Sequence, residues 1–234
     1  MAPFATLHTS TNFLHARVAK TLAAANFNGL DLAVEPGFEY GVTNKTPSYL
    51  AKFPMGKIPA LETPSGFYLA EATAMAYYVS ESGPCSAQLL GRSVEDRALV
   101  QMWIAFADSE LFFPSQTILA HVLGRKKYDP EAGDEKEAAF ERSLKRLELH
   151  LAQEGKKWLV RDEEVSLADL SVASSLLWPL NWFMDPEYRK NYPKTMDWWE
   201  RLMAVESVGK AFGAPVSMCE EKAKMDGSAP PTLG

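Results

Sequence analysis

The sequence predicts a small α/β unit followed by an all-α bundle, and two observations carry this prediction. Over the first eighty residues, short alternating apolar runs are separated by turns that contain Pro or Gly, and short helical segments lie between them. Beyond residue 90 the apolar residues recur every three or four positions, and no strand pattern follows. A chain of 234 residues is long enough for two small domains or one large domain.

The elements of the first unit follow the order βαβ, a short helix, and then ββα. Strands are predicted at residues 4–8, 30–34, 59–62 and 67–69, and the last two are joined by a turn at Pro64-Ser65-Gly66. Helices are predicted at residues 17–26, 47–53 and 71–81. This order is that of a small sandwich of the thioredoxin type.

The helical half begins after a stretch of linker composition. We expect domain boundaries at 1–82, a linker at 83–94, a helical domain at 95–224 and a flexible tail at 225–234. Two apolar stripes with helical spacing mark the first long helices: Leu99, Met102, Trp103 and Phe106, then Phe140, Leu144, Leu147 and Leu151. Pro114 is expected to kink or end the first of these helices, because proline cannot donate a helical hydrogen bond.

Ser166 and Asp169 precede an apolar run at 170–177 and have the spacing of a capping box. The run is apolar on nearly all sides, which predicts a helix buried at the centre of the bundle. We interpret Asp169 as a folding element, with a catalytic acid as the less favoured reading.

Composition favours a soluble globular protein. The net charge of −6 and the pI of about 5.3 argue against nucleic acid or an anionic membrane as the main partner. Cys85 and Cys219 are expected to be reduced thiols, and the four histidines show no metal-ligand spacing, so no metal site is predicted. With no leader or long apolar run, we expect a cytoplasmic protein without membrane contact.

The segment KFPMGKIPAL at 52–61 contains the most informative dipeptide, Ile58-Pro59. A proline here sits at the entrance of a strand, and an X–Pro bond can adopt the cis form. A cis bond would turn the backbone N–H and C=O of Ile58 outward, where an extended peptide could pair with them. Glu71 lies just before a helix whose free N–H groups suit an anion. Together these features predict a site for a small zwitterionic peptide.

This set of motifs resembles the cytosolic glutathione transferases. The strings KFPMGKIPAL (52–61), MAYYVS (75–80), FADS (106–109), SLAD (166–169) and DPEYRK (185–190) look like the transferase-like domain of elongation factor 1 gamma and like related stand-alone fungal transferases. The resemblance runs from about residue 4 to residue 224. It implies the glutathione transferase fold and glutathione as the thiol substrate. The elongation-factor subunit continues into a charged linker and a further domain, whereas this sequence ends in a short tail, which favours a stand-alone transferase.

The resemblance also implies which residues hold glutathione. Its cysteine would pair with the backbone at Ile58 and Pro59, its γ-glutamyl amine would meet Glu71, and its α-carboxylate would meet the helix start after Glu71. Lys57 would neutralise the glycyl carboxylate, with Lys45 as a second candidate. Many relatives have a serine where this chain has Ala72, so one hydrogen bond is lost unless Thr73 supplies it. We therefore expect weakened glutathione binding.

Thiol activation needs a donor at the start of the first helix, where the helix dipole also favours an anion. The loop offers Ser10 as first choice, with Thr11 and Asn12 close behind, and it contains no cysteine or tyrosine. Ser10 and Thr11 could equally serve only as caps of that helix.

An acceptor pocket is expected between the first bundle helix and the end of the chain. Its candidates are Trp103, Phe106, Glu110 and Phe113, with the cluster Trp178-Pro179-Leu180-Asn181-Trp182-Phe183. Aromatic residues at helical spacing more often belong to a core. The six tryptophans of the helical half would suit a large, flat, hydrophobic ligand.

Three functions remain open at this stage. The first is a glutathione-dependent enzyme of fungal secondary metabolism or detoxification, which either conjugates an electrophile or isomerises an activated alkene by reversible addition. The second is a non-catalytic interaction domain of the elongation factor 1 gamma type. The third is a ligand-storage protein that uses only the apolar pocket. Relatives pair into two-fold dimers across the two domains, so a homodimer is expected.

Overall fold

The computed structural model describes residues 2–222, so the predicted tail lies outside the described range. The first half contains four strands, β1 (Ala5–His8), β2 (Leu32–Val34), β3 (Ala60–Glu62) and β4 (Tyr68–Ala70). Its helices are α1 (Ala16–Asn28), the short η1 (Thr43–Lys45), α2 (Pro47–Lys52) and α3 (Ala72–Glu81). Every predicted strand and helix of this half is present, with ends that differ by one or two residues.

The four strands form one mixed sheet in the order β2-β1-β3-β4. β1 pairs in parallel with β2 and antiparallel with β3, with His8 opposite Ala60, and β3 pairs antiparallel with β4. The parallel pair is connected through α1, as a βαβ crossover requires. The Ile58–Pro59 peptide bond is cis and lies directly before β3.

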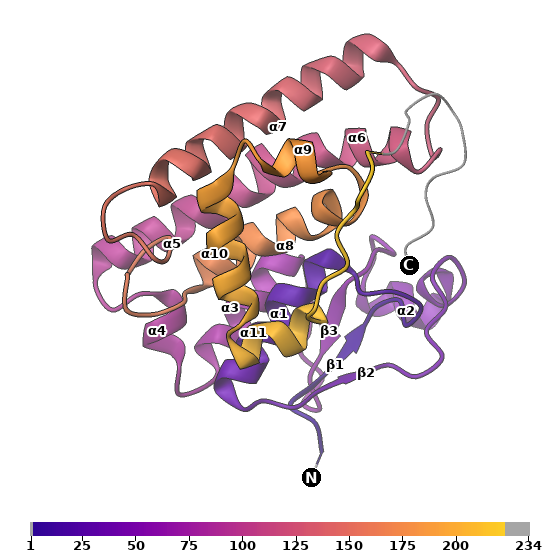
Figure 1. Ribbon diagram of the computed structural model, residues 1–234. Helices are drawn as coiled ribbons and strands as arrows, with labels where there is room; N and C mark the ends of the chain where they lie inside the picture. Colours follow the sequence, from indigo (N-terminus) through magenta and orange to yellow (C-terminus); the bar gives the residue numbers. More distant parts are fainter. Residues whose placement is uncertain (1, 223–234) are drawn as a thin grey trace.

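The helices of the first half cover the two faces of the sheet unequally. α1 and α3 lie between the sheet and the helical half, where α1 packs against both α3 and α8 (Figure 1). α2 lies on the opposite face and forms a small separate apolar cluster with Phe38, Tyr49, Phe53 and Ala60. Helices α1 and α3 therefore lie between the sheet and the bundle, and α2 covers part of the other face of the sheet.

In the described part of the second half, the regular elements are all helices, and loops connect them. Its elements are α4 (Ser86–Leu90), α5 (Val94–Phe106), η2 (Ala107–Phe112), α6 (Phe113–Val122), α7 (Pro130–Leu151), α8 (Leu167–Trp182), α9 (Pro186–Arg189), α10 (Pro193–Met203) and α11 (Glu206–Phe212). The short helix α4 falls inside the predicted linker at 83–94, because Leu89 and Leu90 are buried in the main core and anchor this segment.

Pro114 does not end the first bundle helix. The chain continues from α5 into α6 through one π-helical stretch, η2, and Pro114 occupies the first turn of α6, where no N–H is needed. The wider turn leaves carbonyl groups to be satisfied by side chains: Ser175 donates to the Ala107 carbonyl at 3.0 Å and Ser115 to the Phe112 carbonyl at 2.8 Å. The expectation that Pro114 ends the first bundle helix was therefore wrong, because helical turns run on through η2 into α6, and the alternative expectation of a kink stays a prediction.

Helix α8 is the buried centre of the bundle, as its apolar run predicts. The capping box at its start forms, and Asp169 does more than cap it. One carboxylate oxygen accepts from the Ser166 N–H at 3.0 Å, and the other accepts from the Leu159 N–H at 2.9 Å and the Trp198 indole at 3.0 Å. Asp169 is fully buried and joins three segments, so its folding role is the one that the structure supports.

Candidate functional site

The backbone polar groups of Ile58 have no hydrogen-bond partner in the described part of the chain. Among the described residues, neither the N–H nor the C=O of Ile58 makes a hydrogen bond. Buried Asn44 ties this segment to η1, because its side chain accepts from the Gly41 N–H and donates to the Gly56 carbonyl at 2.6 Å. Gly56 has φ of +58°, where any other residue would be strained, and a Cβ there would lie 3.0 Å from the Asn44 carbonyl oxygen, so glycine is strongly favoured.

Lys45 and Lys57 come from the two segments that Asn44 joins. Both are exposed, and the Lys45 Nζ lies 3.7 Å from the position that a Cβ on Gly56 would take. Neither lysine side chain has a hydrogen bond or an ion pair among the described residues. Two free cations therefore flank the open Ile58 backbone.

Glu71 has the most unusual backbone conformation in the described chain. With φ of 68° and ψ of 114°, it is the one described non-glycine residue with positive φ. Such a conformation costs roughly 1–3 kcal/mol and tends to mark functional sites. Glu71 directly precedes α3 but does not cap it through its side chain, and its exposed carboxylate has no partner among residues 2–222. The first N–H groups of α3 and a free carboxylate thus lie next to each other.

Thr73 turns away from this site. Its hydroxyl donates to Asp108 on η2 at 2.8 Å and accepts from the Lys20 ammonium of α1 at 3.0 Å. A threonine hydroxyl has one proton, so no donor is left for a ligand carboxylate. The Thr73 hydroxyl therefore does not supply the ligand hydrogen bond that is lost because Ala72 replaces a serine. Ala72 itself is buried and offers only its backbone groups.

Lys20 and Arg17 complete a polar network between the two halves. The Lys20 Nζ lies 3.8 Å from Asp108, and an Arg17 nitrogen lies 3.7 Å from the same carboxylate. Burial lowers the pKa of Lys20 from 10.5 to about 8, the Arg17 charge acts in the same direction, and Asp108 opposes both. This network was not predicted from the sequence. A usable signal was present, because Lys20 lies on the same face of α1 as the buried residues Ala16, Ala19 and Ala23.

The loop between β1 and α1 holds the candidate activating groups. The Ser10 hydroxyl accepts from the Asn12 N–H at 3.3 Å and donates to no described residue, while Thr11 and Asn12 are exposed. The helix begins at Ala16, and its N-cap residue is His15, without a side-chain cap. Ser10 and Thr11 are therefore not caps of α1, because they lie several residues before the position where the helix begins.

Two further loop residues were not selected from the sequence. Thr9 is buried, and its hydroxyl has no partner within the described chain. The His15 ring packs 5.2 Å from the Trp178 ring, centroid to centroid, and burial, aided by Arg17, lowers its pKa from 6.5 to about 4. His15 is therefore neutral at physiological pH and carries the loop onto helix α8.

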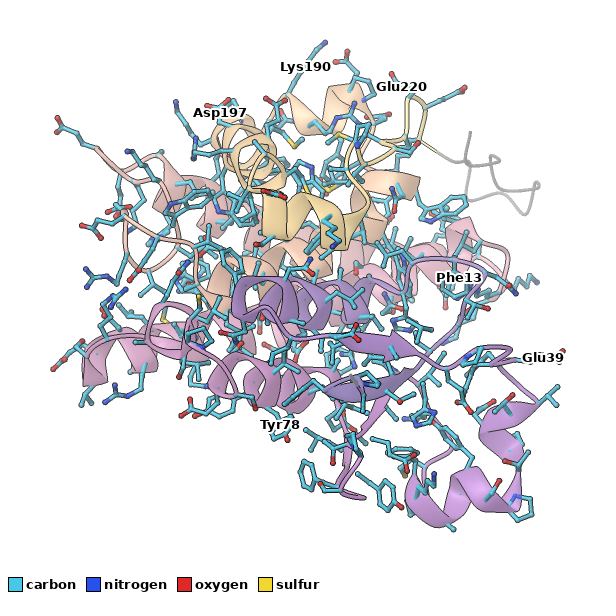
Figure 2. The ribbon with its side chains drawn as sticks, turned by 90° about the horizontal axis from the view of Figure 1, so that it is seen from below. Phe13, Glu39, Tyr78, Lys190, Asp197 and Glu220 are labelled. Carbon is cyan, nitrogen blue, oxygen red and sulfur yellow. The ribbon has the colours of Figure 1, made fainter. Side chains whose placement is uncertain are left out.

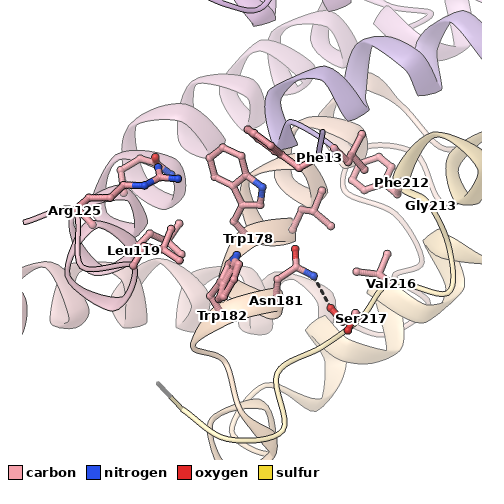
Figure 3. Close-up of a pocket in the computed structure, with 15 residues that line it drawn as sticks. Phe13, Leu119, Arg125, Trp178, Asn181, Trp182, Phe212, Gly213, Val216 and Ser217 are labelled. Carbon is pink, nitrogen blue, oxygen red and sulfur yellow. Dashed lines mark hydrogen bonds between the residues drawn. The ribbon is translucent and has the colours of Figure 1, made fainter. Parts of the chain in front are cut away.

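A cavity of about 660 Å³ opens beside this loop, between the two halves of the chain (Figure 3). Phe13, which lies at the edge of the molecule, and Leu14 contribute the loop side (Figure 2). The other walls come from α6 and the turn after it, from α8, and from the last residue of α11 and the segment that follows. The lining residues from these walls are Gln116, Leu119, Ala120, Leu123, Arg125, Leu177, Trp178, Asn181, Trp182, Phe212, Gly213, Val216 and Ser217. The cavity is apolar, with few polar groups.

The first four pocket candidates do not line this cavity. Trp103 and Phe106 are buried in the core, where Trp103 packs against Phe106 and His150 and beneath the Arg146 guanidinium. Phe113 is exposed and Glu110 is half-exposed, and neither reaches the cavity. Helical periodicity could not distinguish these faces. By contrast, Trp178, Asn181 and Trp182 of the second candidate cluster are lining residues.

Family models match both halves of the chain. The model described as "Glutathione S-transferase, N-terminal domain" matches residues 6–81, and "Glutathione S-transferase, C-terminal domain" matches residues 106–206. A relative in Fusarium sp., "Glutathione S-transferase-like protein LUC7", is 41% identical over 92% of this chain and 95% of its own length. The chain therefore belongs to the glutathione S-transferase family.

The elongation factor branch is also represented among the relatives. "Elongation factor 1-gamma" of Sus scrofa is 35% identical over 90% of this chain, which spans 47% of that protein. The GST-like domain of elongation factor 1-gamma from Saccharomyces cerevisiae has the same fold, with a TM-score of 0.79 at 22% identity over 99% of this chain and 100% of that one.

A solved transferase shares the fold as well. Glutathione S-transferase I from maize, in complex with an atrazine glutathione conjugate, has a TM-score of 0.76 at 26% identity, over 91% of this chain and 97% of that one. The predicted fold class, a thioredoxin-like domain followed by a helical bundle, is confirmed by the fold and by these comparisons.

Within residues 2–222, none of the helices combines the length and apolar character that a membrane crossing needs. In the same range, no group of three or more His, Cys, Asp or Glu side chains is arranged to hold a metal ion.

Proposed function

We propose that this protein is a glutathione-dependent enzyme that activates the glutathione thiolate for attack on a hydrophobic electrophile. The observation that carries the proposal is Glu71, whose free carboxylate and strained backbone lie at an uncapped helix start. Strain of this kind persists only where the surrounding structure enforces it, and it is common where a ligand is clamped.

The binding mode follows from the free groups. The unpaired N–H and C=O of Ile58, beside Pro59, would pair with the cysteinyl backbone of glutathione as a short added strand. Glu71 would bind the γ-glutamyl ammonium, and the backbone N–H groups of Ala72 and Thr73 would bind the neighbouring carboxylate at the α3 N-terminus. Lys57 and Lys45 would neutralise the glycyl carboxylate. Because no side-chain hydroxyl helps at Ala72, we expect binding weaker by one hydrogen bond, about 1.5–3 kcal/mol.

Ser10 is our first choice for thiol activation, with Thr11 and Asn12 as alternates. A free thiol has a pKa of about 8.5, and a donated hydrogen bond together with the α1 N-terminus stabilises the thiolate. The uncommitted Ser10 proton supports this role. The apolar cavity that begins at Phe13, three residues further on, would receive the acceptor.

Two reactions fit the same thiolate. In conjugation, sulfur bonds to an electrophilic carbon. Either a leaving group departs from that carbon with its electron pair, or, in addition to an activated alkene, the neighbouring carbon takes up a proton. In isomerisation, sulfur adds to an activated alkene, the resulting single bond rotates, and sulfur is expelled again with its electron pair. We also propose a role in fungal secondary metabolism or detoxification. What supports its fungal part is that relatives in Fusarium sp. and Aspergillus aculeatus are glutathione S-transferase-like proteins. We further propose a cytoplasmic homodimer.

The first test is glutathione binding and the effect of Ser10→Ala on the bound thiol. We expect wild-type protein to bind millimolar glutathione and to turn over a chromogenic electrophile. Loss of one bond to a charged sulfur should raise the thiol pKa by about one to two units and lower turnover at pH 7 about tenfold or more, with little change in glutathione affinity. Thiolate absorbance as a function of pH gives the pKa directly.

Two comparison variants locate the activating group. Thr11→Val and Asn12→Ala should leave the thiol pKa unchanged. An unchanged pKa in Ser10→Ala, with a shift in one of the others, moves the role to that residue. If glutathione does not bind at all at millimolar concentration, the enzyme proposal fails.

That failure would favour the second candidate, a non-catalytic interaction domain. Its supports are the relatives in the elongation factor 1-gamma group and the missing hydroxyl at Ala72. Probe binding in the cavity without any effect of glutathione would instead indicate ligand storage.

A further inference from the structure

One charged side chain, that of Arg125, is found among the described residues that line the cavity. The other polar residues of the lining, Gln116, Asn181 and Ser217, are neutral, and Asn181 already donates to the Ser217 carbonyl. No carboxylate lines the cavity in the described chain. The whole protein carries a net charge of −6, whereas the described lining of this cavity carries one positive charge and no negative one.

The backbone holds Arg125 at the cavity. Helix α6 ends at Val122, and Gly124, with φ of 63°, turns the chain back over the last helical turn. The N–H groups of Arg125 and Lys126 both donate to the Ala120 carbonyl, at 2.8 and 3.0 Å. The three consecutive basic residues Arg125, Lys126 and Lys127 are all exposed, and of these three Arg125 alone lines the cavity.

The Arg125 guanidinium is free to bind a ligand. Within residues 2–222 it makes no hydrogen bond and no ion pair. Figure 3 shows Arg125 at one end of the cavity, with Trp178 and Trp182 between it and the segment at Phe212 and Gly213. A guanidinium presents a planar fork of N–H donors that matches a carboxylate or a sulfonate.

We propose that the acceptor is a large apolar molecule that carries an anionic group, and that Arg125 binds this group. The inference rests on the proposed function, since it takes the cavity as the acceptor site. Anion binding at Arg125 itself needs no glutathione. The aromatic and aliphatic walls hold the apolar body, and the guanidinium selects acceptors with a carboxylate or similar group over neutral ones.

The test compares two fluorescent probes that differ by one group. 1-Anilinonaphthalene-8-sulfonate and N-phenyl-1-naphthylamine share the same rings, and only the first has a sulfonate. We expect Arg125→Gln to weaken sulfonate-probe binding about tenfold and to change neutral-probe binding less than twofold. Lys126→Gln and Lys127→Gln make the same change in net charge and should alter neither affinity. Arg125→Lys should recover part of the loss.

Several results would overturn the inference. Equal weakening of both probes would mean that Arg125 shapes the cavity or the end of α6 and does not recognise the anion. Equal effects of Lys126→Gln and Arg125→Gln on sulfonate-probe binding would mean that the net charge of the protein, and not the position of Arg125, determines the affinity. No effect of Arg125→Gln would exclude recognition outright.

A turnover measurement separates this inference from the proposed function. Ethacrynic acid and its methyl ester are activated alkenes that differ by one carboxylate charge. Arg125→Gln should raise KM for the acid about tenfold and leave KM for the ester unchanged. If wild-type protein turns over neither compound while the sulfonate probe retains its dependence on Arg125, the enzyme proposal fails and the anion site stands. Turnover of both with no change in Arg125→Gln refutes the anion site alone.

Discussion

Glu71 and His15 illustrate how single residues define this site. The conformation of Glu71 is fixed from both sides, by β4, which ends at Ala70, and by α3, which begins at Ala72. Nothing in the local sequence Glu-Ala-Thr predicts a positive φ, because that angle results from the surrounding fold. The sequence selected Glu71 because it lies just before a helix start, and the family resemblance then implied its role toward the γ-glutamyl amine. Its backbone strain became visible only in the structure.

His15 makes the protein sensitive to mild acid. Burial, aided by the Arg17 charge, lowers its pKa to about 4 in the folded state, against 6.5 when unfolded. Between pH 6.5 and 4 the unfolded chain binds a proton that folded His15 does not, so stability falls as the pH falls through this window. The loss is about 1.4 kcal/mol per pH unit below 6.5.

The variant His15→Phe keeps a ring against Trp178 but removes the titration. As the pH falls from 7 to 4.5, we expect the unfolding free energy of the wild type to decrease more than that of the variant. Urea unfolding at pH 7, 5.5 and 4.5 measures it. Other groups, including His150, whose burial also lowers its pKa, are common to both proteins and cancel in the difference. A difference that stays constant over this range would contradict the assignment.

At the scale of elements, local patterns predicted what local forces determine. The Pro-Ser-Gly turn and the Ser166 and Asp169 spacing act over three or four residues, so both the β3–β4 hairpin and the start of α8 were predictable. The continuation of helical turns from α5 to Pro114 was not predicted, because the π-helical stretch η2 has carbonyl partners such as Ser175, which is distant in sequence. Helix α4 was missed because the burial of Leu89 and Leu90, not the composition of their segment, orders it.

Asp169 tests the capping interpretation at this scale. Asp169→Ala would leave the Leu159 N–H, the Ser166 N–H and the Trp198 indole without their shared acceptor inside the bundle. Each unsatisfied buried donor costs about 1–3 kcal/mol, so we expect a loss of about 4 kcal/mol or more in unfolding free energy. Exposed Asp197 on α10 is the matched control, and Asp197→Ala should cost less than about 1 kcal/mol.

Thermal and urea unfolding of the two variants provide the measurement. Asp169→Asn retains one carbonyl oxygen and should fall between wild type and Asp169→Ala, which keeps the test informative if the alanine variant does not fold. Similar stability of the Asp169 and Asp197 alanine variants would refute the role of Asp169 in joining the three segments.

At the scale of the whole molecule, the site depends on contacts that no local pattern encodes. The cavity joins the loop at Phe13, helix α8 at Trp178 and the segment at Val216, which lie far apart in the sequence. The two halves are joined by a buried hydrogen bond from the Ser174 hydroxyl to the Ala16 carbonyl, at 2.6 Å, and by a partly buried one from Thr73 to Asp108. The sequence indicated an aromatic pocket near the end of the chain, but it could not indicate which face of α5 turns inward.

Exposed apolar side chains on both halves support the proposed dimer. Phe67, Tyr68 and Tyr77 of the first half, and Leu99 and Met102 of α5, each keep 40% or more of their surface exposed. In a two-fold interface, a patch on one half of a subunit meets a different patch on its partner, and the reverse contact forms at the same time. These two patches are suited to such an exchange across the two domains.

We expect sedimentation equilibrium to give twice the chain mass of 26.0 kDa for the wild type. Tyr77→Glu would bury a charge in the apolar contact and should weaken association at least tenfold. Leu149→Glu on α7 introduces the same charge at another exposed apolar residue, and it should leave the dimer intact. A monomeric wild type at micromolar concentration would refute the dimer, and equal weakening by the two variants would assign the contact to a different face.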